Sequence, residues 1–312
     1  MRKGSILNMI NFKTPELSDR HWVDELFFAR NNRGCEYSFT VLYCWKDAYE
    51  QKIARVNDYA VQFLSGSLGP CYPFPVGKGE LKPVIDVMME DAEERGEPFR
   101  LICATHEDLA QLEELYPGRF EFSEDRHGFD YLYQIDRLAD LKGKKLHGKR
   151  NHIHRFEENY PDWRAERITS ENMDECQAME DEWTRLSMET KDEESTASLP
   201  EEREAMRLTM QDFDALGEEG LLIRAGGRVI AFTLGRKLSE DTYDVHFEKA
   251  YGDIQGAYPI VNREFARQIR ADHPEIVYLN REDDMGLEGL RKAKESYYPD
   301  LMVEKYTAIL KE

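Results

Sequence analysis

One segment of the sequence gathers cationic side chains that could bind phosphate. Residues 142–155 hold four lysines, two arginines and three histidines but no acid, in a chain whose formal net charge is −20. Phosphate is strongly hydrated and needs charge-assisted hydrogen bonds in exchange, which lysine and arginine supply. On a helix, Lys145, Lys149 and His152 share one face, with Arg150 to the side. The segment therefore predicts an anion site, with a solvated basic helix paired to acidic neighbours as the alternative.

The histidines of this segment do not predict a metal site. Two of them, His152 and His154, are two residues apart and do not share a helix face, and no cysteine lies nearby. We expect no metal here.

A second candidate is the strand end His246-Phe247-Glu248-Lys249. Period-two alternation predicts that His246 and Glu248 point to one face and Lys249 to the other. Glu248 could accept a proton from an attacking amine if burial raises its pKa. The alternative is an exposed strand end with an ordinary ion pair.

The densest polar run follows a predicted strand that ends at Leu279. Loops at the carboxyl ends of strands are where open α/β sheets bind ligands. Asn280 opens this loop, and Arg281 with Glu282 could clamp a substrate ammonium or carboxylate. Helical spacing then places Lys294 and Tyr297 on a common face. The alternative is a charged, capped loop before an amphipathic helix.

Apolar periodicity predicts alternating helices and strands along the whole chain. We expect a first mixed α/β domain over residues 1–138 and a second over residues 139–312. The second should contain three consecutive antiparallel strands at 221–225, 229–237 and 242–249, then a helix, a strand at 276–279, a helix at 286–297 and a last strand at 302–309. Residues 188–198 are predicted to be an exposed loop.

This order of elements resembles the N-acetyltransferase (GNAT) superfamily. We therefore predict an α+β, mixed α/β fold of two tandem GNAT-like domains, each a mainly antiparallel sheet flanked by helices. In that fold the fourth and fifth strands splay around an acyl donor, so the residues from His246 to Lys249 would line the site. Residues 253–258 occupy the place of the loop that binds the pyrophosphate of coenzyme A, but only Gly256 fits that pattern, and Asp253 would repel a pyrophosphate.

The residues together resemble a bacterial family of unknown function that is similar to the C-terminal domain of phosphatidylglycerol lysyltransferase. The resemblance rests on residues 143–152, 246–249, 256–258 and 280–297. It implies transfer of an activated acyl group, or of an aminoacyl group borne by tRNA, to an amine or hydroxyl. On this interpretation Glu248 is the base or ammonium anchor, Arg281 and Glu282 clamp the substrate, and Tyr297 is the acid. The expected substrate-binding residues are Lys145, Lys149, Arg150, Asn151, His246, Lys249, Gly256, Asn280 and Lys294.

Two other functions stay open at this point, a ligand-sensing module without catalysis and an acyl-CoA-dependent N-acetyltransferase. The donor would be acyl-CoA or aminoacyl-tRNA, and the sequence assigns no further cofactor. The partner would be a phosphate-bearing small molecule or charged tRNA that binds the local basic patch, because a chain of net charge −20 repels phosphate polymers elsewhere. DNA is not an expected partner.

Composition sets the remaining expectations. The longest apolar run, residues 229–234, is far shorter than the roughly 20 residues of a membrane-spanning helix. We therefore expect a cytoplasmic protein without a transmembrane segment, which disfavours a lipid acceptor. The five cysteines have irregular spacing and no Cys-x-x-Cys pair, which predicts buried free thiols.

Overall fold

The computed structural model describes residues 10–190 and 196–311 and divides them into two compact units. Unit 1 comprises residues up to Asn32, Glu36–Phe129 and the C-terminal segment from Glu304; unit 2 comprises Arg33–Cys35 and Asp130–Val303. The chain enters unit 2 at Asp130, whereas the sequence-based division lay at residue 138. Residues 191–195 of the predicted 188–198 loop lie outside the described residues.

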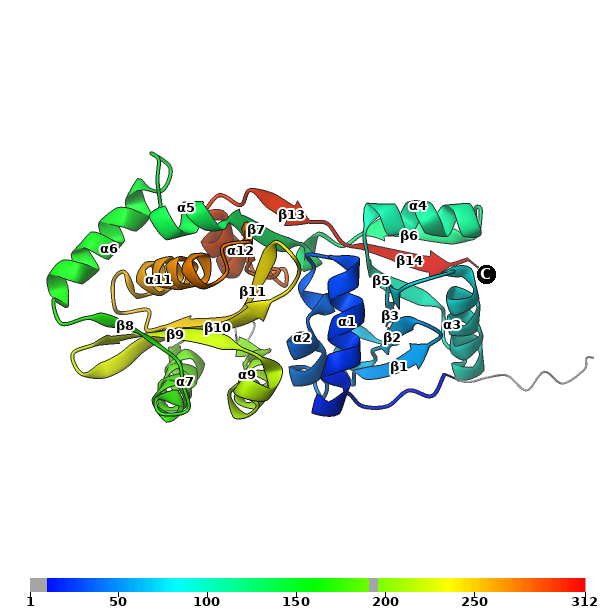
Figure 1. The fold of residues 1–312 in the computed structure, drawn as a ribbon, viewed down its shortest axis with the longest axis horizontal. Helices are drawn as coiled ribbons and strands as arrows, with labels where there is room; N and C mark the ends of the chain where they lie inside the picture. The colour runs from blue at the N-terminus through cyan, green and yellow to red at the C-terminus, as the bar shows by residue number, and fades with distance from the viewer. Residues whose placement is uncertain (1–9, 191–195, 312) are drawn as a thin grey trace, which may run out of the picture. The chain divides into compact units, whose positions relative to one another are not determined.

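Unit 1 contains two sheets, which Figure 1 shows in blue and cyan with the red C-terminal strand. One sheet has the order β1-β2-β4 and the other β3-β5-β14-β6. The strands are β1 (Lys52–Val56), β2 (Tyr59–Phe63), β3 (Tyr72–Pro73), β4 (Val76–Gly77), β5 (Arg100–Ala104), β6 (Phe120–Glu124) and β14 (Tyr306–Leu310). The helices are α1 (Arg20–Arg30), α2 (Phe39–Cys44), α3 (Lys82–Arg95) and α4 (His106–Leu115).

Unit 2 is built on one seven-stranded sheet of order β13-β7-β12-β11-β10-β9-β8. Its strands are β7 (Asp130–Gln134), β8 (Arg164–Arg167), β9 (Glu219–Ala225), β10 (Arg228–Lys237), β11 (Thr242–Ala250), β12 (Tyr278–Asn280) and β13 (Leu301–Val303). Its helices are α5 (Ile135–Asp140), α6 (His147–Asn159), α7 (Met173–Thr190), α9 (Leu199–Gln211), α10 (Phe213–Leu216), α11 (Ala257–Asp272) and α12 (Glu288–Glu295). The fold is the predicted mixed α+β, tandem GNAT-like one.

The last predicted strand is wrong in one respect. Residues 302–309 were expected to form a single strand, but the structure splits them into β13, which pairs with β7 in unit 2, and β14, which pairs with β5 and β6 in unit 1. Two residues, Glu304 and Lys305, separate the strands. β7, which lies within the predicted first domain of residues 1–138, likewise belongs to the sheet of unit 2, where it pairs with β12.

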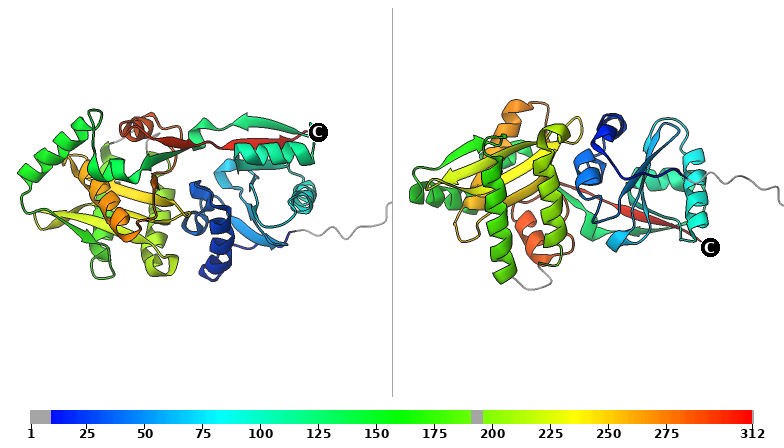
Figure 2. Two further views of the ribbon diagram at one scale, coloured as in Figure 1. Left: turned by 45° about the horizontal axis from the view of Figure 1, so that its top comes forward. Right: turned by 90° about the horizontal axis from the view of Figure 1, so that it is seen from below.

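Helices cover both faces of the sheet in unit 2. Figures 1 and 2 show α11 on one face and α7 with α9 on the other. The buried residues of α11 recur at intervals of three and four, among them Ile260, Phe265 and Ile269, which gives the helix one apolar face for the sheet. The outer side of α11 is in turn contacted by α5 and α6.

A gap between two strands opens the sheet at one end. β11 and β12 run parallel and pair only over Thr242–Asp244 and Tyr278–Asn280. β12 ends at Asn280, whereas β11 continues to Ala250. Beyond Asp244, β11 is therefore paired on the edge that faces β10 and no longer pairs with β12 on its other edge.

A β-bulge lies next to this opening. Leu234 of β10 is paired with Phe247 and Gly235 with Val245, so His246 has no partner in the ladder. A Cβ atom on Gly235 would lie 2.1 Å from the carbonyl oxygen of Asp244, which explains the glycine. The simple period-two alternation predicted for His246 and Glu248 is interrupted here, because a bulge adds one residue to one strand.

The structure places the five cysteines mostly in the interior. Four of them are buried, and Cys103 is half-buried. Among the described residues, no helix combines the length and the apolar character needed to cross a bilayer.

The start of α11 is fixed by a close approach to α6. Gly256 has φ +90°, and a Cβ atom there would lie 2.5 Å from the carbonyl oxygen of His152 and 2.8 Å from Cβ of Phe156. The substitution G256A should lower the free energy of unfolding by about 2 kcal/mol or more, because it combines a left-handed backbone with a backbone clash.

The matched control is G252A in the same loop, where an added Cβ meets nothing within 4 Å. It should change stability by less than about 0.5 kcal/mol. Urea unfolding of the two variants measures the difference, and equal losses would contradict the packing role assigned to Gly256.

Candidate active site

A buried ion pair lies where β11 and β12 part. The Nη2 atom of Arg281 donates to Oε1 of Glu248 at 2.9 Å, and the two side chains are only 14% and 9% exposed. Asn262 of α11 donates from Nδ2 to the other carboxylate oxygen at 3.1 Å. The carboxylate is thus held on both oxygens, by groups from two different elements.

Two tyrosines and a lysine complete this cluster. Nζ of Lys149 lies 3.9 Å from the ring centroid of Tyr297, and Cζ of Arg281 lies 5.0 Å from the same centroid. Lys149 also donates to the hydroxyl of Ser296 at 2.7 Å. The ring of Tyr133 packs edge-on to Tyr297 at 6.4 Å. Two cations therefore share one aromatic ring, whose electron-rich face stabilises positive charge.

The environment shifts the pKa values of these groups. Burial, with help from the charge of Arg281, lowers the pKa of Lys149 to about 8, although Glu248 opposes the shift. Burial also opposes the charge of Arg281, but Glu248 and the hydroxyls of Tyr133 and Tyr297 outweigh it and raise its pKa. Burial raises the pKa of Tyr297 well above its ordinary value. At neutral pH Lys149 and Arg281 therefore both keep their positive charge beside Glu248.

The structure brings together the two segments on which the functional hypothesis depended. Lys149 comes from the basic segment 142–155, and Arg281 comes from the loop after β12. Four predicted residues, Lys149, Glu248, Arg281 and Tyr297, meet in this cluster. Sequence reasoning missed Tyr133, Ser296 and Asn262, which carry no local signal of their own.

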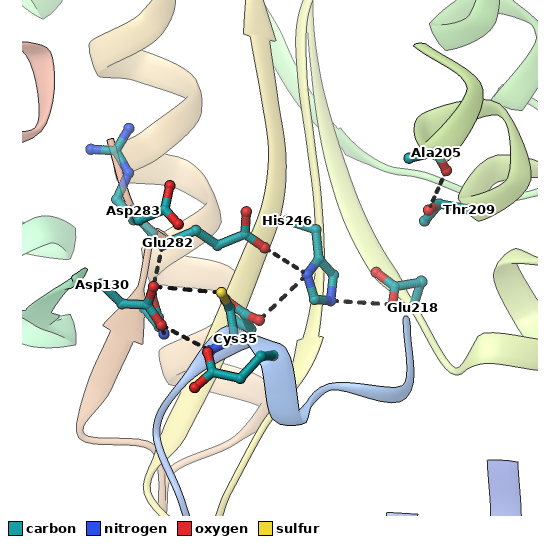
Figure 3. Close-up of polar contacts among 12 residues, drawn as sticks. Cys35, Asp130, Ala205, Thr209, Glu218, His246, Glu282 and Asp283 are labelled. Atoms are coloured by element: carbon teal, nitrogen blue, oxygen red, sulfur yellow. Dashed lines mark hydrogen bonds and ion pairs between the residues drawn. The ribbon is translucent and has the colours of Figure 1, made fainter. Parts of the chain in front are cut away.

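A second cluster surrounds His246, and Figure 3 shows its imidazole between the carboxylates of Glu282 and Glu218. Nδ1 lies 3.2 Å from Glu282 and 3.4 Å from Asp244, and Nε2 lies 3.6 Å from Glu218. Burial lowers the pKa of His246, Glu218 opposes this shift and Arg236 adds to it.

This second cluster contains a donor set that could hold a cation. One ligand atom each from Asp244, His246 and Glu282 lie within 4.8 Å of one another. Carboxylate and imidazole ligands suit several divalent metals. The guanidinium of Arg236, however, already brings positive charge to His246.

The loop after β12 separates the two clusters. The buried amide of Asn280 donates to the carbonyl of Arg33 at 2.7 Å and to Asp130 at 2.9 Å, and its oxygen accepts from the backbone of Glu282 at 2.6 Å. Glu282 has φ +55°. This turn sends Arg281 toward Glu248 and Glu282 toward His246, rather than both toward one point.

The rest of the basic segment lies mainly on the surface. α6 begins at His147, so Lys145 precedes it, exposed, with Nζ 5.0 Å from the ring centroid of Tyr298. Arg150 donates to the backbone carbonyls of Leu141 and Gly143. Asn151 is exposed and shares a hydrogen bond with His147. The exposed basic side chains of the segment are Lys142, Lys144, Lys145, His147, His152, His154 and Arg155.

Three further predicted residues have structural partners. Lys249 is buried, pairs with Glu202 at 2.8 Å and lies 3.8 Å above the ring of Trp183. Lys294 is buried and donates to the backbone carbonyls of Arg281 and Asp283. It therefore braces the loop from within. Gly256 is required by the contact between α6 and the start of α11.

Comparison with known proteins gives one family and several related structures. The profile of the family described as "Phosphatidylglycerol lysyltransferase, C-terminal" matches residues 28–309. A crystal structure of a conserved protein of unknown function from Bacteroides thetaiotaomicron is 38% identical, with TM-score 0.91, over 97% of this chain and 100% of that chain.

Two more distant structures share the fold. L-PGS from Bacillus licheniformis is 16% identical with TM-score 0.62, over 93% of this chain and 91% of that one. FemX is 9% identical with TM-score 0.57, over 96% of this chain and 98% of that one. A search of curated proteins finds no match.

The lowered pKa of Lys149 gives a prediction with a definite sign. The pKa of Lys149 is about 8 in the folded protein, whereas its ordinary value is 10.5. Between these two pH values the unfolded chain therefore binds more protons than the folded chain does. The contribution of Lys149 to the free energy of unfolding should therefore rise as pH increases from about 8 to about 10.5. The stability difference between the wild type and K149M, followed by urea unfolding, should show this rise.

Two further variants test the causes of the shift. E248Q removes the attraction that keeps the lysine charged, so the lower end of the pH window should move to lower pH. R281M removes the repulsion between the two cations, so the lower end of the pH window should move to higher pH. Shifts in the opposite directions, or a stability difference that does not depend on pH, would contradict this electrostatic account.

Proposed function

Because the chain belongs to the phosphatidylglycerol lysyltransferase C-terminal family, we propose that it transfers an activated acyl group, in the form of an aminoacyl ester of tRNA, to an amine or hydroxyl acceptor. The fold is that of acyl and aminoacyl transferases. The nature of the donor and the roles of individual residues are our proposal.

One observation carries the proposal. The Nη1 atom of Arg281 is buried and has no hydrogen-bond partner within the part of the chain that the structure describes. Leaving a buried charged donor unpaired is costly, and a bound substrate would supply the missing acceptor. The ammonium of Lys149, which lies against the same tyrosine ring as Arg281, supplies a second positive charge. A net positive, largely buried pair of donors fits the carbonyl oxygen of an ester and the negative charge that develops on it.

The proposed reaction follows from these groups. The acceptor attacks the ester carbonyl, and the oxygen becomes negatively charged while hydrogen-bonded to Arg281 and Lys149. Glu248 holds Arg281 in place and takes the proton that the acceptor loses. The carbon–oxygen bond to the ribose then breaks, and Lys149, with a pKa of about 8, can return a proton to the leaving oxygen.

Tyr297 has a different place in this scheme from the one expected. Its ring lies against both cations, and its phenol keeps its proton because burial raises the pKa. We propose that it chiefly positions Lys149 and Arg281, and that proton donation from its hydroxyl is secondary.

The alternative donor, acyl-CoA, has less support. Its pyrophosphate would need the backbone at the start of α11, but α6 lies against Gly256 there. Asp253, exposed in the same loop, would repel it. The exposed cations of residues 142–155 offer the phosphates of tRNA a broader surface.

The first test compares aminoacylated with deacylated tRNA. The wild type should bind bulk aminoacyl-tRNA more tightly than the same tRNA after deacylation, because only the ester carbonyl reaches Arg281. R281M should remove most of this preference and leave the affinity for deacylated tRNA unchanged. Filter binding at fixed salt measures both affinities.

R207M is the matched control, because Arg207 is a surface arginine that bonds to Glu204 and Gln211 of its own helix. It should preserve the preference. Equal wild-type binding of charged and deacylated tRNA, or displacement of charged tRNA by acetyl-CoA, would refute the proposed donor.

The second test addresses the basic surface. The double variant K144A/K145A should weaken the binding of charged and deacylated tRNA equally. It should also reduce the slope of log affinity against log salt by up to about 2, because each lost phosphate contact removes roughly one released counterion. An unchanged salt slope would show that the phosphates bind elsewhere.

A further inference from the structure

Three buried polar atoms around Glu248 have no hydrogen-bond partner among the described residues. They are Oγ1 of Thr233, Oδ1 of Asn262 and Nη1 of Arg281. Thr233 is 0% exposed and Asn262 is 3% exposed. Neither residue has a place in the proposed chemistry so far.

All three residues converge on one carboxylate. Thr233 of β10 is the cross-strand partner of Glu248, so their side chains lie on the same face of the sheet. Asn262 and Arg281 each donate to Glu248, at 3.1 Å and 2.9 Å. The three orphan atoms therefore all belong to residues that pair with or donate to Glu248.

The orientation of the Asn262 amide is fixed by its neighbour. Its NH₂ group faces the carboxylate of Glu248, and a flipped amide would place two acceptors against each other. Its oxygen is thus an acceptor that points away from Glu248. Thr233 adds a hydroxyl that can accept a second hydrogen bond.

The charges decide which donor fits these acceptors. Glu248 is already outnumbered by Arg281 and Lys149, so a third cation would be repelled. An uncharged primary amine has two N–H groups for two acceptors and carries no charge. The α-amine of an aminoacyl ester is one carbon away from the carbonyl that Arg281 would bind.

We infer that Thr233 and Asn262 form a subsite that binds the uncharged α-amine of the aminoacyl donor while Arg281 binds its carbonyl oxygen. This inference rests on the proposed function and adds a requirement to it: the donor must have a free α-amino group. N-acylated and hydroxy-acyl donors lack one or both of the N–H groups and should bind less well.

The test uses three small probes without a side chain: glycinamide, glycolamide and N-acetylglycinamide. Chemical-shift titrations by NMR should give the tightest binding for glycinamide, and at least about tenfold weaker binding for N-acetylglycinamide. T233V should reduce the affinity ratio of glycinamide to glycolamide by about three- to tenfold, the effect of losing one hydrogen bond.

A control and a second readout separate binding from folding. T209V changes another buried threonine, whose hydroxyl is bonded within α9, and should leave the ratio unchanged. T233V itself should unfold at the same or higher urea concentration than the wild type, because a methyl group replaces a hydroxyl without a partner. A purely structural Thr233 would instead make T233V less stable.

The pH dependence tests the charge state. The ratio of glycinamide to glycolamide affinity should rise with pH around the amine pKa of about 8, whereas the titration of Lys149 affects both probes and cancels in the ratio. A ratio that falls with pH would identify an ammonium and overturn the inference. So would a ratio unaffected by T233V, which would mean that water alone fills the subsite.

The outcome is separable from that of the proposed function. Suppose that charged tRNA is preferred through Arg281 but glycinamide either does not bind or binds no more tightly than the other two probes. Only the amine subsite is then wrong. If glycinamide is selected by Thr233 but charged tRNA is not preferred, the donor assignment fails and the amine belongs to the acceptor.

Discussion

The arrangement of the site depends on the buried ion pair between Glu248 and Arg281. Both residues lie beside the point where β11 and β12 stop pairing, so no ladder between these two strands holds β11 to the loop of Arg281 there. Removing one member of a buried pair typically costs about 3–5 kcal/mol, because the other charge remains unpaired. The pair therefore fixes the position of the loop after β12 relative to β11 and, with it, the direction of the remaining Nη1 donor.

The same loop connects two clusters of different electrostatic character. Arg281 belongs to a cluster with more cations than anions, whereas Glu282 belongs to one with three carboxylates around His246. The separation requires a left-handed residue at Glu282, a conformation that costs a non-glycine residue about 1 kcal/mol or more. The hydrogen bond from the backbone N–H of Glu282 to the side-chain oxygen of Asn280 and the buried amine of Lys294 stabilise that turn. Residues that sequence analysis assigned to substrate thus act here on the shape of the loop.

Local pattern was enough to predict most of the fold and part of the cluster. The hairpins and the amphipathic helices follow from apolar periodicity, and the type and position of Lys149, Glu248, Arg281 and Tyr297 marked them as candidates. The sheet edge of unit 2 was beyond such reasoning, because β7 and β13 join it through pairs separated by more than a hundred residues. Thr233 and Asn262 were missed for a related reason. A threonine in a strand and an asparagine in a helix carry no signal until the register and the helix packing bring them to one carboxylate.

The acidic composition and the cationic site are compatible because they act over different distances. At physiological salt, charges separated by more than about 8 Å of solvent are screened, so the exposed cations before and along α6 dominate the field that a phosphate meets on approach to them. The distributed acidic surface disfavours unspecific adsorption of nucleic acid elsewhere. Inside the cluster, water no longer screens the charges, and Lys149 responds with a lowered pKa. The free energy that burial costs Lys149 would be recovered when an oxyanion forms beside it, so this site is matched to a charge that exists only during the reaction.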